Sequence, residues 1–350
     1  MRLVRPARPK APLLIPTPLR QASPVPRRRP RVLAGAAATL AVAGLAAGCS
    51  SGSGAASATG TITVAAIKGV DTAPLYAGNL PGGTFARTGL HVKIDTFTSV
   101  RAEISALRAG KVDVAAGDYV DFLYSQSIHP GLEIVADGYH AAPGVMEVLT
   151  LPNSGITTPR QLLGRRVGTP EGQVVPATHG HPYSVETLAA WSVLTGDNID
   201  PTKINWDPMP AGRLVRALKT HQVSAIVAQE PYIYDAESQL GATEVFDACS
   251  GPTADLPLTG YFTTRTYARQ NTPLLRAFQS ELDQAQAKAI LPGPVRTVLA
   301  DDGMTKSAAL MTMGAYPTTL NPASPSRVEQ LMFSFELLGH ALNINAMIFH

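Results

Sequence analysis

Acidic and aromatic side chains stand directly behind two apolar segments of this chain. Asp118 and Tyr119 follow the first segment, and Glu230 and Tyr232 follow the second. A carboxylate in such a loop can hold a cation or a hydrogen-bond donor, and a tyrosine ring can form the wall of a ligand cleft. Asp118 also precedes an apolar helical sequence whose N-terminus it can cap, so both roles stay open at this point.

Motifs for catalysis or metal binding are not found in the rest of the folded part. Residues 61–350 contain no Gly-x-Ser-x-Gly nucleophile motif, no phosphate-binding glycine loop and no Cys-x-x-Cys pair. His179 and His181 stand two residues apart, but Pro and Gly neighbours place them in a loop without an acid or cysteine nearby. We therefore expect surface histidines, no metal, no cofactor and no enzyme activity.

Strand and helix sequences alternate through the first part of the folded region. Half-buried strands alternate apolar and polar side chains, and the helix expected here ends at Gly110, a typical stop. The expected strands are residues 61–66, 89–95, 112–116 and 132–136, and the expected helix is residues 100–109. This alternation favours a parallel α/β lobe.

The same order of elements restarts after residue 150. Residues 106–114 (ALRAGKVDV) and 217–225 (ALKTHQVSA) align at an offset of 111 as helix end, tight turn and buried strand. The likeness fits two related lobes, and it also fits two unrelated but well-formed turns. Either way, each strand carries its following loop to the carboxyl edge of a sheet, where open α/β sheets bind ligands. The further elements expected are helices at residues 158–164, 184–195 and 214–219 and strands at residues 165–169 and 223–228.

The N-terminal segment has the composition of an export signal. Arginines at positions 27, 28, 29 and 31 precede 16 mostly apolar residues, 32–47, which lead to Gly48 and Cys49. This order is typical of a secretory signal, and the cysteine after Ala-Gly resembles the lipidated cysteine of a bacterial lipoprotein. Ala46 stands where such signals usually carry a large aliphatic residue. The alternative is a membrane anchor, although a spanning helix needs about 20 residues.

Loss of residues 1–48 would reverse the charge of the protein. Nine of the 29 Lys and Arg lie in that segment, which has no Asp or Glu, so residues 49–350 carry 20 basic and 26 acidic side chains, a net charge of −6. That balance argues against nucleic acid as a partner. Residues 49–60 are small and polar enough to form a flexible tether. Cys249 is the one further cysteine, so a lipidated Cys49 leaves no disulfide within the chain.

Several short motifs occur in a fixed order between residue 61 and about residue 290. They are APLY at residues 73–76, GLHV at 89–92, AL-x-x-G-x-V-D at 106–113, L-x-G-x-x-V-G at 162–168 and EPY at 230–232. Together they resemble the nitrate, sulfonate, taurine and thiamine-precursor group of ABC-transporter solute-binding proteins. Gln161 stands where that group usually has Asp, and His221 and Ser224 replace its usual Gly and Asp in the second lobe.

The resemblance implies an α/β fold with two lobes, the type II periplasmic-binding-protein architecture, with mixed and mainly parallel sheets and a two-strand hinge. Lobe I would comprise residues 61–147 and 260–350, and lobe II residues 148–259. The hinge would cross near residues 145–150 and 259–263, and residues 327–342 would return to lobe I. A monomer would capture a small molecule for an ABC permease, held by its lipid on the outer face of the cytoplasmic membrane.

The same resemblance places the ligand contacts in four loops. They are Lys68, Asp71, Thr72, Ala73, Pro74, Asp118, Tyr119, Thr169, Gln173, Glu230 and Tyr232. Lys68 is the one base in these loops. A buried anion such as nitrate or sulfonate needs Arg, Lys or backbone donors, so the acids favour a neutral or cationic heteroaromatic ligand. The alternative is an exported enzyme or sensor subunit that uses the same cleft; a thiamine-precursor synthase group shares the fold but carries a cysteine-rich motif that this chain lacks.

Overall fold

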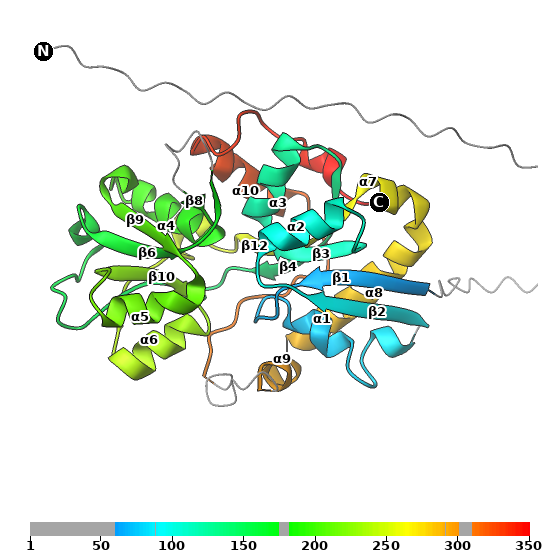
Figure 1. Ribbon diagram of the computed structural model, residues 1–350, viewed down its shortest axis with the longest axis horizontal. Coiled ribbons are helices and arrows are strands. Elements are labelled where there is room, and N and C mark those ends of the chain that lie inside the picture. The colour runs from blue at the N-terminus through cyan, green and yellow to red at the C-terminus, as the bar shows by residue number, and fades with distance from the viewer. Residues whose placement is uncertain (1–59, 88, 175–181, 291, 301–309) are drawn as a thin grey trace, which may run out of the picture. The chain divides into compact units, whose positions relative to one another are not determined.

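The computed structural model describes residues 60–87, 89–174, 182–290, 292–300 and 310–350, which belong to one unit of the chain. Figure 1 shows this unit as two α/β lobes, each built on its own sheet. The predicted signal, Cys49, the tether up to residue 59 and the pair His179 and His181 lie outside the described residues.

Lobe I contains a five-stranded sheet with helices on both faces. β1 pairs in parallel with β2 and β3, and β12 runs antiparallel between β3 and β4. The sheet order is β2 (Leu90–Thr96), β1 (Gly60–Ala66), β3 (Val114–Asp118), β12 (Pro257–Thr264) and β4 (Leu132–His140). Ile62 and Val64 of β1 face the core that includes α8, whereas Ala65 faces the core that includes α2 and α3, as the period of two in a strand requires.

Lobe II repeats this arrangement. β6 pairs in parallel with β9 and β10, and β5 runs antiparallel between β10 and β11. The sheet order is β9 (Asn205–Met209), β6 (Arg166–Pro170), β10 (Ala225–Gln229), β5 (Met146–Thr150) and β11 (Thr243–Asp247), and a small hairpin joins β7 (Gln173–Val174) to β8 (Pro182–Tyr183). The order matches lobe I strand for strand, with β6 in the place of β1.

Ten α-helices and several 3-10 turns connect these strands within the described residues. The α-helices are α1 (Ala73–Gly78), α2 (Val100–Arg108), α3 (Tyr119–Ile128), α4 (Val185–Gly196), α5 (Leu214–Lys219), α6 (Tyr232–Leu240), α7 (Arg265–Gln270), α8 (Thr272–Ala289), α9 (Pro292–Leu299) and α10 (Ala323–Ser334). The 3-10 helices are η1 (Phe85–Arg87), η2 (Pro159–Leu162), η4 (Pro201–Lys203), η5 (Ala211–Arg213), η6 (Gly251–Thr253) and η8 (Ile344–Met347).

The two turns that align at an offset of 111 residues have the same backbone conformation. Gly110 and His221 both lie in the left-handed region, with φ of 65° and 55°. The next residue in each turn donates its N–H back to the helix, over 2.9 Å to the carbonyl of Ala106 in lobe I and of Ala217 in lobe II. The sequence likeness therefore reflects one structural unit used twice, and His221 keeps the turn that glycine usually makes.

Two details differ from the sequence-based expectations. Residues 159–162 form the 3-10 helix η2 instead of the α-helix expected over 158–164. The crossings expected near 145–150 and 259–263 fall inside β5 and β12, so the connections are residues 141–145 and 254–256.

The C-terminal segment packs on both lobes instead of returning to lobe I alone. α10 contacts α3 and β12 of lobe I and also α4 of lobe II. Just beyond α10, the ring of Phe335 lies edge-on to Trp191 of α4, with ring centroids 5.9 Å apart. This segment therefore ties the two lobes together at one side of the molecule.

No helix in the described part of the chain combines the length and the apolar character needed to span a bilayer. Cys249 is a free thiol beside the second crossing, with 2% of its surface exposed. Burial raises the pKa of this thiol to about 12, assisted by the negative charge of Asp247.

Candidate functional site

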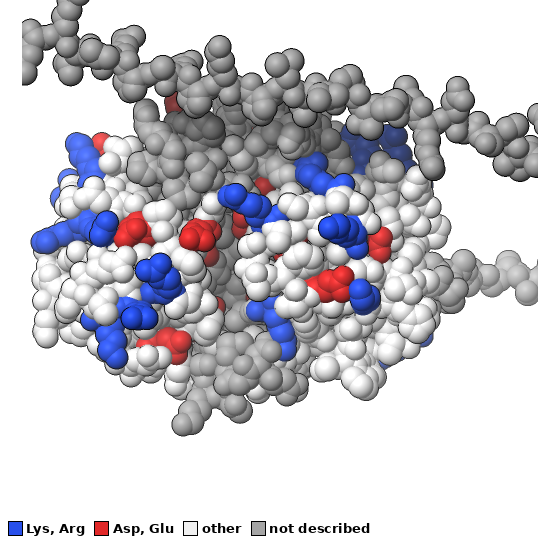
Figure 2. Space-filling model, in the orientation of Figure 1, with Lys and Arg blue, Asp and Glu red and all other residues white. Residues whose placement is uncertain are grey.

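Four carboxyl groups gather at the carboxyl edge of the lobe I sheet. Asp71 lies in the loop after β1, and Asp118 ends β3. Glu103 and Asp121 lie in the first turns of α2 and α3. Because β1 and β3 are parallel neighbours, the loops and helix N-termini that follow them meet at one edge. Figure 2 shows a groove between the lobes with both acidic and basic side chains along its borders.

Glu103 is the most deeply buried of these acids. None of its surface is exposed, and neither carboxyl oxygen completes a hydrogen bond within the described residues. The carboxyl packs against the β3 backbone, since a Cβ atom at Gly117 would lie 3.1 Å from its Oε2. Burial raises the pKa of Glu103 to about 9, helped by the charges of Asp71 and Asp121, and the Ile67 N–H acts in the opposite direction. Glu103 therefore keeps its proton at neutral pH.

Asp118 has the capping role that its sequence position allows. It is the N-cap of α3, and its Oδ1 accepts a hydrogen bond of 2.7 Å from the backbone N–H of Asp121. Burial, followed by the charges of Asp121 and Glu186, raises the pKa of Asp118 well above its usual range. The cap uses one oxygen, and the carboxyl still responds to charges from both lobes.

Asp71 lies half-buried in the loop between β1 and α1. A Cβ atom at Gly69 would lie 2.6 Å from Asp71 Oδ1, so a larger residue at that position would require the Asp71 side chain to move. Burial raises the pKa of Asp71 to about 6, Glu186 adds to the rise, and the backbone N–H groups of Asp71 and Thr72 oppose it. Asp71 therefore titrates close to physiological pH.

Lobe II faces these acids with Glu186, at the N-terminus of α4. Gln229, the last residue of β10, donates from Nε2 to Glu186 Oε1 over 2.9 Å. Burial raises the pKa of Glu186, against hydrogen bonds from Ser184, its own N–H and Gln229. The charge of Glu186 in turn raises the pKa of Asp71 and Asp118. Carboxyls of the two lobes thus act on one another.

Glu230 connects lobe II to a third crossing segment. Its Oε1 accepts a hydrogen bond of 3.1 Å from the Thr312 N–H, and its Oε2 accepts one of 3.1 Å from the Tyr234 N–H. Burial raises the pKa of Glu230. Two residues beyond Thr312, the N–H of Gly314 donates to the Tyr139 hydroxyl of lobe I over 2.6 Å. Glu230 therefore helps to fasten the lobes together.

Four of the predicted contact residues have side chains that turn away from the groove into the protein. Thr72 and Thr169 are almost fully buried, as are Ala73 and Pro74 at the start of α1. The Thr72 hydroxyl donates to the Ile67 carbonyl over 2.6 Å, and the hydroxyls of Thr169 and Thr187 lie 2.6 Å apart. These side chains shape their loops.

The two tyrosines predicted to wall the ligand lie elsewhere. Tyr119 is fully buried in lobe I, and its hydroxyl donates to Asp137. Its ring fills the space over Gly260, where a Cβ atom would lie 2.8 Å from ring atoms. Tyr232 lies on the side of lobe II where α5 and α6 meet, in a groove shared with Gly212 and Arg216. Helix direction at α3 and α6 turns both rings out of the cleft.

The remaining predicted positions are a lysine and a glutamine. The Nζ atom of Lys68 lies 5.5 Å from the centroid of the Tyr76 ring, at a small depression that also includes Ile94. Gln173 lies in β7, and its side chain is outside the described part of the structure.

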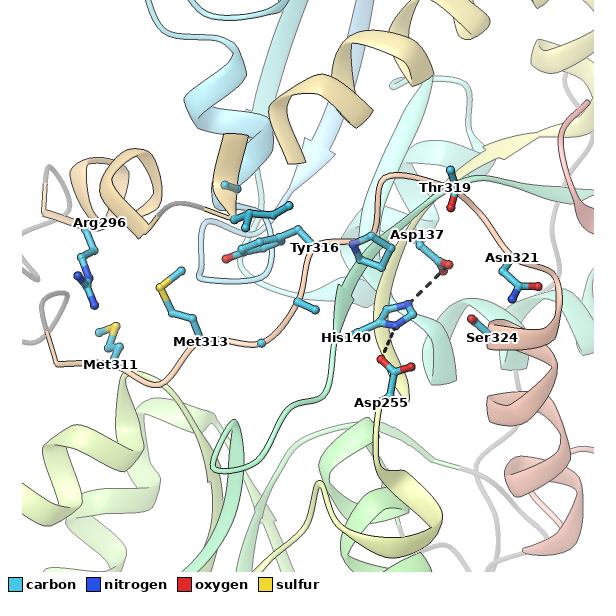
Figure 3. Close-up of a pocket in the computed structure, with 15 residues that line it drawn as sticks. Asp137, His140, Asp255, Arg296, Met311, Met313, Tyr316, Thr319, Asn321 and Ser324 are labelled. Atoms are coloured by element: carbon cyan, nitrogen blue, oxygen red, sulfur yellow. Dashed lines mark hydrogen bonds and ion pairs between the residues drawn. The ribbon is translucent and has the colours of Figure 1, made fainter. Parts of the chain in front are cut away.

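A separate cavity of about 730 Å³ lies beside the crossings, as Figure 3 shows. His140, at the end of β4, lies there between Asp137 at 3.6 Å and Asp255 at 3.2 Å. Burial of the imidazole opposes its protonation, but hydrogen bonds and charges of the two aspartates outweigh that effect and raise the pKa of His140. Met313 and Tyr316 from the third crossing form part of its wall.

Within the residues that the structure describes, no group of three or more His, Cys, Asp or Glu side chains is arranged to hold a metal ion. The groove acids come from separate loops and helices of two lobes, and they do not converge on one point. The arrangement suits an extended polar ligand better than a single ion.

Comparison with known proteins gives the family. Residues 55–287, about two thirds of the sequence, match the model of the NMT1-like family. The chain belongs to the NMT1-like family. No curated protein matches it in sequence.

Solved structures similar to this NMT1-like chain have the periplasmic-binding-protein fold. The ligand-binding component of an ABC-type import system from Staphylococcus aureus, solved with zinc bound, matches at a TM-score of 0.68 and 14% identity over 82% of this chain and 96% of that one. The alkanesulfonate-binding protein SsuA from Xanthomonas axonopodis pv. citri, bound to MOPS, matches at 0.65 and 15% identity over 82% and 97%. The desulfurization enzyme DSZB matches at 0.63 and 14% identity over 82% and 96%.

These matches agree with the family and fold expected from the motifs, a two-lobed α/β protein similar to ABC-type solute-binding proteins. Three acids of the groove were missing from the sequence-based set. Glu103 and Asp121 lie one turn into helices that follow the recognised loops, and Glu186 follows the N-cap Ser184 of α4. The internal repeat could have drawn attention to Glu103, because the aligned position in lobe II is the apolar residue Leu214.

Proposed function

We propose that this NMT1-like chain is an exported, lipid-anchored solute-binding protein that captures a small molecule between its lobes and passes it to an ABC permease. The proposal rests on the carboxyl edges of the two sheets, one in each lobe, which face the same groove. The negative charge of Glu186 in lobe II contributes to the raised pKa values of Asp71 and Asp118 in lobe I, which supports a ligand site shared by the two lobes. Contacts with both lobes are what allow binding to favour a closed state.

The connections between the lobes support such a motion. Residues 141–145 and 254–256 connect the lobes, with the Ala141 N–H donating to the Leu256 carbonyl over 2.8 Å. The third segment pairs its Ala315 with His140 in both directions, at 2.8 and 3.2 Å. Short crossings beside one another act as a hinge, because a few backbone torsions there move each lobe as a rigid body.

Capture is tested with protein purified under native conditions. We expect a co-purified solute, seen by native mass spectrometry as added mass, and a fall in the midpoint of thermal unfolding when this solute is removed by dialysis. Small-angle scattering should show a smaller radius of gyration in the loaded form. Solute-free protein whose unfolding and scattering do not respond to any of a broad panel of sulfonates, nitrate, pyrimidines, amines and amino acids would contradict capture.

Anchoring depends on Cys49, which the proposal makes the lipidated N-terminus. Metabolic labelling with a radioactive fatty acid should mark the wild-type protein and leave the Cys49→Ser variant unmarked and released from membranes. Cys249→Ser is the matched control and should be labelled as the wild type is. A Cys49→Ser variant that stays in the membrane fraction would show that residues 32–47 act as a membrane anchor instead.

An exported enzyme in the same fold is the second candidate, because the similar structures include one named as a desulfurization enzyme. The two functions separate on the fate of the bound molecule. A solute-binding protein should release its ligand chemically unchanged after prolonged incubation at 37 °C. Appearance of a product, measured by mass spectrometry on the released solute, would favour the enzyme.

A further inference from the structure

His140 is the residue at which the three crossings between the lobes meet. It ends β4, and the first crossing, residues 141–145, follows directly. Its backbone pairs in both directions with Ala315 of the third crossing, at 2.8 and 3.2 Å. Its side chain reaches the second crossing, residues 254–256, where Nδ1 lies 3.2 Å from Asp255 Oδ1 (Figure 3). The charge of this imidazole therefore bears directly on a contact between two crossings.

The imidazole lies between two acids, one in lobe I and one on the second crossing. Its Nε2 atom is 3.6 Å from Oδ2 of Asp137, and neither atom completes a hydrogen bond within the described residues. The other Asp137 oxygen accepts a hydrogen bond from the Tyr119 hydroxyl. A neutral imidazole has one N–H, whereas an imidazolium has one for each acid. Protonated His140 is thus the form that can satisfy Asp137 and Asp255 together.

Other polar groups line the same cavity or hold the segments around it. They are Tyr139 on β4, Tyr316 on the third crossing, the Gln286 amide on α8, Arg296 on α9 and Arg327 on α10. Burial raises the pKa of both tyrosines, so they stay neutral over the physiological range. The arginines carry positive charge, which opposes protonation of His140, whereas the two aspartates are its direct neighbours and favour it.

The second crossing has a left-handed backbone at Asp255, with φ of 53°, and the side chain there is largely exposed. Arg327 of α10 holds this backbone through the carbonyls of Ala254 and Asp255, at 2.7 and 3.0 Å. Hinge residues absorb a change of lobe arrangement in their backbone torsions. A change in the Asp255 torsions would carry its carboxyl away from His140, whereas Asp137 would stay beside it on β4.

We propose that protonation of His140 stabilises the lobe arrangement of this structure, because the imidazolium binds Asp255 of the second crossing and Asp137 of lobe I at once. Deprotonation leaves one of the two acids without an N–H and allows the second crossing to change its torsions. The hinge is thereby sensitive to pH. This property goes beyond the proposed function, since it concerns the hinge and does not depend on which solute the groove takes.

Acid pH should favour this arrangement. Burial opposes protonation of His140, but hydrogen bonds and charges of the two aspartates raise its pKa above the ordinary value of 6.5. An arrangement without the Asp255 contact loses part of this rise and holds the proton less firmly. The preference is therefore greatest at acid pH and is lost as the pH rises through the raised value. Because the Asp255 side chain is exposed, we expect this pair to change the ratio of the two arrangements about threefold.

Distances between the lobes of solute-free protein test the proposal. Ser105→Cys on α2 and Lys219→Cys on α5 place one exposed spin label on each lobe. Cys49→Ser removes the N-terminal cysteine, and Cys249 is buried and escapes brief labelling. Double electron–electron resonance at pH 5.5 should show mainly the distance of this structure. At pH 8.5 a second distance should gain, with the ratio of the two populations changed about threefold.

Two variants and a control assign the effect to the His140 contact. His140→Gln keeps a side-chain donor but takes up no proton, and should abolish the pH dependence. Asp255→Asn removes one exposed acid, keeps a residue that accepts the left-handed backbone, and should abolish most of it. In that variant the pKa of His140, measured by nuclear magnetic resonance of its ring protons, should fall. Asp197→Asn, which removes an exposed acid at the end of α4, is the control and should respond as the wild type does.

Three results would overturn the proposal while leaving solute capture intact. They are a distance distribution that is the same at both pH values, a gain of the structure's own distance at pH 8.5, and an unchanged pH response in Asp255→Asn. If His140→Gln does not fold, Asp255→Asn still decides the question, because its side chain is exposed in the wild type. The proposed function fails on a separate result, the absence of any bound solute.

Discussion

The two lobes are built from the same unit, but their inner edges differ in how their acids are partnered. In lobe II, Glu186 receives a hydrogen bond from Gln229, and Glu230 receives two from backbone N–H groups. In lobe I, Asp118 receives its capping bond and Glu103 completes none in the described structure. Since the sheet order and the turns agree, the fold cannot be the reason for this difference. At this edge, lobe I therefore retains a buried carboxyl group, that of Glu103, whose oxygens complete no hydrogen bond in the described structure.

The largest expected effect comes from exchanging the equivalent positions. Glu103→Leu should stabilise the ligand-free protein at pH 8 by about 3 kcal/mol, because the folded state there pays for holding a proton that the unfolded chain has released. The folded pKa of Glu103 is about 9, against 4.5 for an unperturbed glutamate. The unfolding free energy of the wild type should therefore fall as the pH rises from about 4.5 to about 9, and the gain in the variant should shrink towards pH 4.5. Urea denaturation at several pH values measures this.

The reciprocal exchange, Leu214→Glu, is the control for that result. It buries a carboxyl in the lobe II core and should destabilise the protein by about 3 kcal/mol or more at pH 8. Equal stabilities of the wild type and Glu103→Leu across this pH range would show that Glu103 is satisfied in solution, and the contrast between the lobes would then disappear.

A smaller effect is expected at the first crossing, where lobe I holds His140 between two aspartates. The raised pKa of His140 means that its protonated form stabilises the folded state; this contribution is complete below the unfolded pKa of about 6.5 and is lost as the pH rises through the folded value. His140→Gln should therefore cost about 1.5 kcal/mol at pH 6 and less at pH 9. His129→Gln, in the loop after α3, is the control variant. A pH-independent cost at His140 would assign it to packing alone.

The smallest effect separates the two turns. His221 adopts a left-handed conformation that costs a non-glycine residue about 1 kcal/mol, so His221→Gly should stabilise lobe II by up to that amount. Gly110→Ala should destabilise lobe I by about 1 kcal/mol, although a Cβ atom there meets no other atom within 4 Å. The midpoint of thermal unfolding measures both effects. If it shifts in the same direction in both variants, the two turns are not equivalent.

Much of the fold could be predicted from local sequence, and less of the site. The turn before β3 and the strands themselves follow from patterning, because apolar periodicity and glycine act over a few residues. The direction of a side chain at a helix start does not follow from patterning. Tyr119 begins α3 and its side chain is fully buried, although no local feature of the sequence indicates which way a side chain at this position points. Glu103 could not be recognised as a site residue from the sequence, because it stands at a position where a helix normally carries an apolar core residue.

The buried thiol of Cys249 has a practical consequence for following the motion of the lobes. If Cys49 carries lipid, the mature chain has one thiol, and that thiol lies next to a crossing, where little of it reaches solvent. The rate at which this thiol is alkylated would then report how often the hinge region opens. No cysteine has to be introduced for the measurement, and no second thiol has to be removed. A ligand that closes the lobes should lower the alkylation rate of Cys249, and a ligand that binds without closure should leave this rate unchanged.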